Sequence, residues 1–236
     1  MLSAHPLRST RSADETTIGR QDHPWAAVDV VLFTVSEERL KTLLVRIKNG
    51  PLCGRWAFPG GLVGIEESLD AAARRELREK TPVRDLYLEQ LYTFGETHRN
   101  PLTRVVSTAY FALVPPPAPL PRAGTKYADA AWFDVAALPS LAYDHNRVAE
   151  LALDRLRAKI EYTNVVYGLL RREFTLAELQ RLYEIIRGTP LDRRNFRKRI
   201  LASRLLRRLP RYRRGAHRPA ALYAFHDRSL RHVELF

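Results

Sequence analysis

The sequence predicts an α+β protein built from two folded units, and three observations lead to this prediction. Apolar, β-branched runs separated by polar turns occupy the chain up to about residue 155 and indicate a mixed β-sheet. Three short helical patterns and two short strand-like runs follow in the remaining part. The basic charge is concentrated there as well: between Arg187 and Arg218 lie 13 basic residues and a single acidic residue, Asp192. A nearly neutral body therefore carries one basic module.

Composition excludes several classes of protein. Of the 236 residues, 45% are hydrophobic, which is enough for a core, and the net charge of +13 indicates a polyanionic partner. Cys53 is the only cysteine, so no intrachain disulfide can form, and we expect a cytoplasmic protein. The chain contains no apolar run long enough to span a membrane. Residues 1–23 are polar, do not resemble a secretory signal, and are expected to form a disordered tail.

The first unit, residues 24–155, is expected to form the sheet and its covering helices. Strands are predicted at 26–35, 41–47, 87–95, 105–114 and 130–135, with loops rich in Gly or Pro at 48–61 and 115–121. Ser68 is the predicted N-cap of a helix over 68–79 that Pro82 ends. A second helix is predicted from Asp144 to about Tyr162.

The second unit, residues 160–236, has the element order of a winged helix-turn-helix. The short apolar run VVYGLL comes first. Thr175 and Glu178 then form the pattern of a capping box in front of a helix over 175–186. Asp192 is the predicted cap of a helix over 193–203, and two short strands around a basic turn complete the unit.

The helix over 193–203 is the predicted recognition helix. Phe196 and Ile200 are one turn apart and should face the core with Leu201. The remaining faces carry the candidate DNA contacts Arg193, Arg194, Asn195, Arg197 and Lys198. Arg and Asn are side chains that reach guanine and adenine edges in the major groove. A merely solvated face usually mixes charges, a membrane-binding helix needs a broad apolar face, and no stacking platform for RNA is visible, so double-stranded DNA is the expected partner.

Further candidate DNA contacts lie outside that helix. Thr175 and Thr189 sit near helix starts, where hydroxyls and amides often bind phosphates. The candidates on the expected wing are Arg213, Arg214, His217 and Arg218. Such basic side chains suit phosphate or minor-groove contacts.

Residues 61–83, GLVGIEESLDAAARRELREKTPV, resemble the Nudix box, G-x5-E-x7-R-E-U-x-E-E-x-G-U, in which U is aliphatic. The matching residues are Gly61, Glu67, Arg75, Glu76, Leu77, Glu79 and Val83. The resemblance implies an α/β/α sandwich with a mixed sheet, and a family activity in which divalent metal ions assist the cleavage of nucleoside diphosphates linked to another moiety. Carboxylates at i, i+3 and i+4 share one helix face, which in the family holds the metal.

Two positions depart from this pattern. Lys80 replaces the third carboxylate, so an ammonium should weaken Mg²⁺ binding and pair with Glu76 one turn earlier. Pro82 replaces a glycine that permits a positive φ at the helix exit. We therefore expect a Nudix fold that requires no metal and no longer hydrolyses. The alternatives are an active Mg²⁺-dependent ADP-ribose pyrophosphatase and, for Glu76 and Glu79, an ordinary solvated helix face.

Residues 92–114, YTFGETHRNPLTRVVSTAYFALV, resemble the ADP-ribose pyrophosphatase branch of Nudix proteins, which implies an ADP-ribose-like or NAD-derived ligand. The candidate ligand-binding residues are Phe58, Arg75, Glu76, Glu79, Lys80, Arg99 and Arg104. Among them, Arg99 and Arg104 are candidates for the diphosphate and Phe58 for stacking on an adenine. The alternatives are exposed loop arginines and a core aromatic residue.

Together the two halves are similar to the Nudix-related transcriptional regulators of NAD metabolism. The C-terminal segments FTLAELQRLYEII, PLDRRNFRKRIL and RRGAHRPAALYAF carry the more specific part of this resemblance. It implies a homodimeric repressor that binds a palindromic operator and releases it when the Nudix domain binds ADP-ribose or a related NAD metabolite. A sister branch senses a sugar such as arabinose. The resemblance therefore leaves two classes of effector, NAD-derived metabolites and sugars.

Overall fold

The computed structural model describes residues 23–83, 85–214 and 219–233. The expected N-terminal tail lies outside these residues except for its last position. None of the helices in the described ranges has the length and apolar character needed to cross a bilayer.

A mixed sheet forms the middle of the first unit. Its strands are β1 (Trp25–Ser36), β2 (Arg39–Ile47), β3 (Trp56–Ala57), β4 (Gly60–Leu62), β5 (Tyr87–Phe94), β6 (Val105–Leu113) and β7 (Tyr127–Asp134). The central strand β1 pairs in parallel with β6 and antiparallel with β2 and β4. Antiparallel pairing adds β5 beside β6, and β3 and β7 beside β2.

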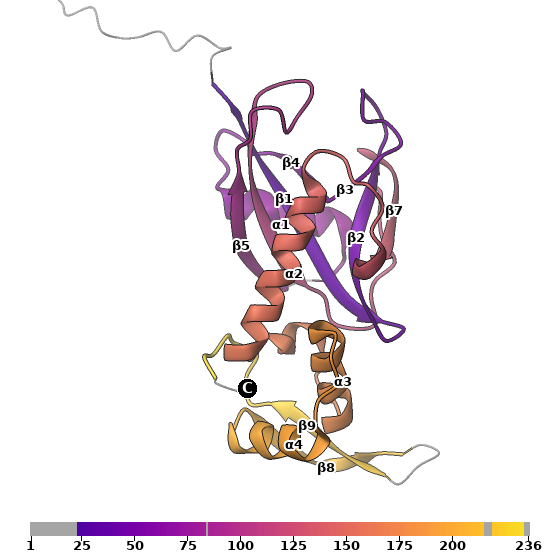
Figure 1. Cartoon of the computed structure of the whole chain (residues 1–236), viewed down its shortest axis with the longest axis vertical. Helices are drawn as coiled ribbons and strands as arrows, with labels where there is room; N and C mark the ends of the chain where they lie inside the picture. The colour runs from indigo at the N-terminus through magenta and orange to yellow at the C-terminus, as the bar shows by residue number, and fades with distance from the viewer. Residues whose placement is uncertain (1–22, 84, 215–218, 234–236) are drawn as a thin grey trace, which may run out of the picture.

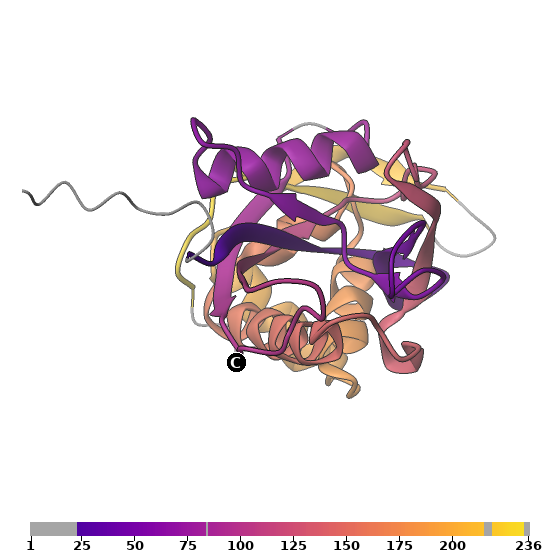
Figure 2. The same cartoon turned by 90° about the horizontal axis from the view of Figure 1, so that it is seen from above.

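Helices cover both faces of this sheet (Figure 2). The helix α1 (Leu69–Lys80) packs on one face and α2 (His145–Tyr162) on the other, with a short 3-10 helix η1 (Val135–Ala137) before α2. Alternation along β1 accounts for the two layers: Val28 and Val30 belong to the core beneath α1, whereas Val31 and Phe33 belong to the core beneath α2. The expected α/β/α sandwich is confirmed.

The second unit is a winged helix-turn-helix. It consists of a 3-10 helix η2 (Val165–Leu169), α3 (Leu176–Arg187), α4 (Arg193–Ala202) and a hairpin of β8 (Leu206–Arg213) and β9 (Ala220–Phe225). Both predicted caps are present: the Thr175 hydroxyl accepts from the Glu178 N–H, and the Asp192 carboxylate accepts from the Asn195 N–H. The first expected helix is only the 3-10 turn η2.

One hydrophobic core joins the two units. The helix α2 runs from the sandwich down to the winged helix (Figure 1). A single cluster of buried side chains extends from Phe33 in β1 through Leu156 and Ile160 in α2 to Tyr183 in α3 and Phe225 in β9. The winged helix is therefore packed against the sandwich rather than attached by a free linker.

The expected loop over 48–61 is partly wrong, because it contains β3 and β4. These very short strands form because β2 and β1 offer them pairing partners. The exit of α1 is also unusual. The helix ends at Lys80, and Thr81 has an extended backbone (φ −140°) rather than the left-handed one that a glycine exit favours.

Candidate ligand cavity and nucleic-acid interface

A cavity of about 410 Å³ opens in the sandwich, within the size range of small-molecule sites. Its walls include Ala27, Asp29, Phe58, Gly60, Gly61, Arg99, Asn100, Lys126, Tyr127 and His145. These residues come from β1, from the segment holding β3 and β4, from the loop after β5, and from the starts of β7 and α2. The fold thus brings together segments that are distant in sequence.

A buried carboxylate organises one wall of the cavity. The Asp29 carboxylate accepts from Ser107 Oγ (2.6 Å) and from Arg99 (3.2 Å), and it lies 3.4 Å from His145 Nε2. Burial alone would raise the pKa of Asp29, but the His145 imidazole, the Arg99 guanidinium and the Ser107 hydroxyl together hold it below its usual range. This network explains why a charged residue stands in the otherwise apolar run of β1.

Phe58 lies in the same wall. Its side chain is buried and stacks on His145 with 5.5 Å between ring centroids, and its backbone N–H donates to His145 Nδ1 (2.9 Å). Because Nδ1 accepts a hydrogen bond, the ring hydrogen lies on Nε2, which faces Asp29. The expected stacking of Phe58 on an adenine stays a prediction.

The two arginines predicted to bind a diphosphate occupy different positions relative to the cavity. The Arg99 guanidinium, only 4% exposed, is held between Asp29 and Asp144, the latter at 2.8 Å. Arg104 donates to the Glu96 carbonyl (3.0 Å) and is not part of the cavity wall. Arg99 therefore shapes the wall, while a direct contact with a diphosphate by either residue stays a prediction.

The helix α1, which carries the residues of the Nudix-like box and is called the box helix below, is tied to the preceding loop as the resemblance implies. Arg75 donates to both oxygens of Glu67 (2.9 Å each), to the Leu62 carbonyl (3.0 Å) and to Glu76 (2.8 Å). Glu76 is buried, whereas Glu79 is about half exposed on an outer groove with Arg75. The solvated-face alternative therefore fails for Glu76.

Lys80 is fully buried beneath the segment that leads into β7. Its Nζ donates to the Ala123 carbonyl (3.1 Å), lies 4.6 Å from the centre of the Tyr127 ring, and approaches Glu79 at 3.8 Å. Burial lowers the pKa of this ammonium, although Glu79 opposes the effect. The predicted pairing of Lys80 with Glu76 is wrong.

Glu76 takes other partners because a distant segment supplies a second lysine. Its carboxylate lies 2.8 Å from Arg75 and 3.4 Å from Lys126 Nζ. Sequence reasoning missed Lys126 because it stands in a segment without a motif. Asp29 and His145 were missed too, although a single acidic residue inside an apolar strand is a detectable signal.

The residues present do not fit the divalent ion that the box implies. Ammonium or guanidinium groups already contact Glu76 and Glu79, and Lys80 takes the place of the third carboxylate. In the described part of the chain, no group of three or more His, Cys, Asp or Glu side chains could hold a metal ion.

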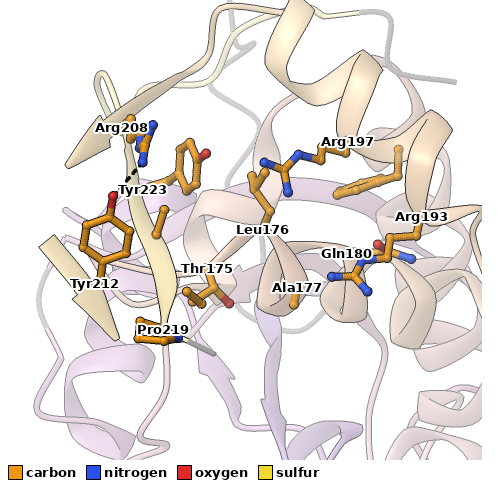
Figure 3. A pocket seen from close by; sticks show the side chains of 13 residues that line it. Thr175, Leu176, Ala177, Gln180, Arg193, Arg197, Arg208, Tyr212, Pro219 and Tyr223 are labelled. Atoms are coloured by element: carbon orange, nitrogen blue, oxygen red, sulfur yellow. Dashed lines mark hydrogen bonds between the residues drawn. The ribbon is translucent and has the colours of Figure 1, made fainter. Parts of the chain in front are cut away.

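The predicted recognition helix presents its basic residues to solvent. Phe196 and Ile200 are buried as predicted for the core face, but the prediction is wrong for Leu201, which is 42% exposed. The candidate contacts on α4 are all exposed: Arg193, Arg194, Asn195, Arg197 and Lys198. A groove of about 590 Å³ separates α4 and the start of α3 from the hairpin. In Figure 3, Arg193 and Arg197 border it on one side and Arg208 and Tyr212 on the other.

Several basic side chains of the hairpin contact other side chains. Arg211 pairs with Glu173 (2.5 Å), Arg213 is held by Glu178, and Arg208 donates to the Tyr212 hydroxyl (2.9 Å). Arg214 is exposed at the end of β8. The wing candidates His217 and Arg218 lie outside the described residues.

The two threonine candidates differ in accessibility. The Thr175 side chain is buried and caps α3, so a phosphate contact through its hydroxyl would compete with Glu178. Thr189 is exposed just after Gly188, whose φ of 77° ends α3 in the left-handed conformation. A phosphate contact stays a prediction at both positions.

Fold and site together define a class: a ligand-binding α/β/α sandwich joined to a DNA-binding winged helix. Residues 23–154 match the NUDIX domain family, and residues 166–225 match the NrtR DNA-binding winged helix domain. The chain therefore belongs to the NrtR family, in which these two domains are combined.

Similar proteins agree with this assignment. The ADPR responsive transcriptional repressor NtrR of Acinetobacter baylyi is 35% identical over 205 residues, which cover 86% of this chain and 82% of that protein. Shewanella oneidensis NrtR complexed with a 27mer DNA is 37% identical with a TM-score of 0.77, over 85% of this chain and 93% of that one. The NUDIX domain of the same protein complexed with ADP ribose is 35% identical with a TM-score of 0.52, over 57% of this chain and 90% of that one.

Replacing Asp29 by Asn should lower the free energy of unfolding by roughly 1–3 kcal/mol at pH 7, because buried Arg99 loses one of its two carboxylate partners. The folded state holds the pKa of Asp29 below its reference value of 3.8. The difference in the free energy of unfolding between the wild type and Asp29→Asn is therefore complete above that pH and shrinks as the pH falls below it. Urea unfolding at pH 7 and pH 3 measures the difference. Exposed Asp129→Asn is the matched control, and an equal deficit of Asp29→Asn at both pH values would contradict the assignment.

Replacing Arg194 or Asn195 by Ala should reduce discrimination between operator and random duplexes by about 5–150-fold, because a bidentate base contact is worth about 1–3 kcal/mol. Fluorescence anisotropy with an operator selected from random duplexes measures both affinities. Arg74→Ala removes the same charge as Arg194→Ala from an exposed position on α1 and should leave discrimination intact. If both α4 variants discriminate as well as the wild type, recognition lies elsewhere.

Proposed function

We propose that the protein is a transcriptional repressor that binds a palindromic operator as a homodimer and releases it when the sandwich cavity binds ADP-ribose or a related NAD-derived metabolite. The observation that carries this proposal is the pairing of a cationic, exposed α4 with a ligand-sized cavity through one continuous core. The expected targets are genes of NAD metabolism, as the resemblance implies.

The DNA-binding half of the proposal rests on charge and geometry. A helix with an exposed N-terminal half rich in Arg and Asn, next to a basic hairpin, matches the docking of winged helices in the major groove. A homodimer would present two such helices, and operator half-sites then lie one helical turn or a multiple of it apart. The similarity to an NrtR protein solved with a 27mer DNA, and to a protein described as a transcriptional repressor, supports the same conclusion.

The effector half rests on the cavity. Its charged wall and its aromatic residues suit a ligand that carries both anionic groups and a ring. ADP-ribose has both, and a relative of this chain was solved with it. A sugar such as arabinose lacks the anionic groups and is the alternative effector.

We further propose that the protein does not hydrolyse its effector. Cations occupy the surroundings of Glu76 and Glu79, where hydrolysis would need a divalent ion, and the exit of α1 is rebuilt around Thr81 and Pro82. The retained glutamates favour the alternative of an active pyrophosphatase, so the test must measure turnover directly.

Coupling between cavity and DNA follows from the shared packing. The start of α2 contributes His145 to the cavity, and its later residues pack in the core with α3. Arg181 on α3 also contacts Glu38 in the β1–β2 turn at 2.8 Å. A ligand that shifts α2 can therefore change how the two recognition helices of a dimer are spaced, and thus the affinity for DNA.

A gel shift on the DNA upstream of the protein's own gene tests the proposal. We expect a retarded protein–DNA complex that dissociates when ADP-ribose is added and stays intact when arabinose is added. NAD is tested in the same way. No AMP should form in the same mixture when Mg²⁺ is present. Release by arabinose alone would contradict the NAD-derived effector, and AMP formation at typical enzyme rates of about 1–10³ s⁻¹ would contradict the sensor-only role.

A further inference from the structure

Lys126 stands where the cavity meets the box helix. Its Nζ donates to the Gly60 carbonyl and lies 3.4 Å from Glu76 Oε1. The side chain is 46% exposed and lines the cavity, so these two oxygens hold the ammonium at the cavity wall.

The oxygens that surround this ammonium are those a hard divalent cation would take. A main-chain carbonyl and a buried carboxylate on the box helix are typical oxygen ligands of Mg²⁺ or Ca²⁺. Here both contact the lysine, which therefore supplies a fixed positive charge at that point. Arg75 contacts Glu76 as well as Glu67, so the four side chains together carry no net charge, and Lys126 is the member of this group that lines the cavity.

Gly61 lies close to this ion pair. A Cβ at Gly61 would lie 2.2 Å from Glu76 Oε1 and 2.9 Å from Lys126 Nζ, so any other residue there would displace the ends of these two side chains. The glycine therefore lets the main chain approach the ion pair closely at the cavity wall.

The other cations around the cavity are less suited to meet an anion. Arg99 is only 4% exposed and already bound by two carboxylates. Lys80 is 1% exposed and donates to the Ala123 carbonyl. Lys48 is exposed at the rim, where water weakens its field.

We propose that Lys126 binds the diphosphate of the effector and that its ammonium does the electrostatic work a divalent ion does in a metal-dependent site. Effector binding is then independent of metal. An ammonium has three N–H donors, and two acceptors are engaged here, so one donor is left for a phosphate oxygen. This inference rests on the proposed function, because it concerns the same effector.

Calorimetric titration of the full-length protein with ADP-ribose, in EDTA and in Mg²⁺, tests the inference. The wild type should bind with the same affinity in both buffers. Lys126→Met should bind at least about tenfold more weakly, since a charge-assisted hydrogen bond contributes about 1.5–3 kcal/mol. Lys126→Arg keeps the charge and should recover most of the affinity. Arg74→Met removes the same charge from an exposed position on α1 outside the cavity and should change the affinity less than about threefold.

Three results would overturn the inference. They are wild-type binding that requires Mg²⁺, unaltered binding by Lys126→Met, and an equal loss in Arg74→Met, which would indicate general electrostatic attraction. In all three cases the proposed effector still binds, so the proposed function survives. A wild type that binds ADP-ribose in neither buffer would overturn the effector itself and the inference with it. Circular dichroism and the melting temperature check the fold of each variant. If Lys126→Met does not fold, two measurements still test the inference. One is the affinity of the wild type in EDTA compared with Mg²⁺, and the other is the affinity of the Lys126→Arg variant.

Discussion

The packing of α2 against both the sheet and the winged helix holds the molecule together as one body. The apolar face of α2 covers one side of the sheet, and its C-terminal half continues into the core of the winged helix through Leu156 and Ile160. Because interiors are packed as densely as crystals, side chains in such a core have few alternative arrangements, and a change at one end is transmitted rather than absorbed. The positions of the cavity and of α4 both depend on this contact.

A second constraint is the charge around the box helix. The scaffold pair Glu67 and Arg75 is intact, so the loop that leads into α1 keeps its geometry. Lysines now neutralise the carboxylates that remain: Lys80 from the helix itself and Lys126 from the segment before β7. Together these contacts pair each of the remaining carboxylates Glu76 and Glu79 with a cation, an arrangement that does not fit a divalent ion.

Local patterns were predictable from the sequence and long-range partners were not. The apolar, β-branched run that forms β1 and the capping box at Thr175 depend on neighbouring residues only, and both are visible in the sequence. The strands β3 and β4 are too short to have a pattern and exist because β2 and β1 pair with them. The partner of Glu76 was mispredicted because Lys126 is 50 positions away in sequence.

The central claim is that the cavity and the DNA-binding helices are energetically coupled. Its most direct test is to titrate ADP-ribose into the free protein and into the protein saturated with operator duplex. Coupling is reciprocal, so we expect the operator to weaken ADP-ribose binding by the same factor by which ADP-ribose weakens operator binding, typically about 5–150-fold. Equal affinities for ADP-ribose with and without the operator would contradict the claim.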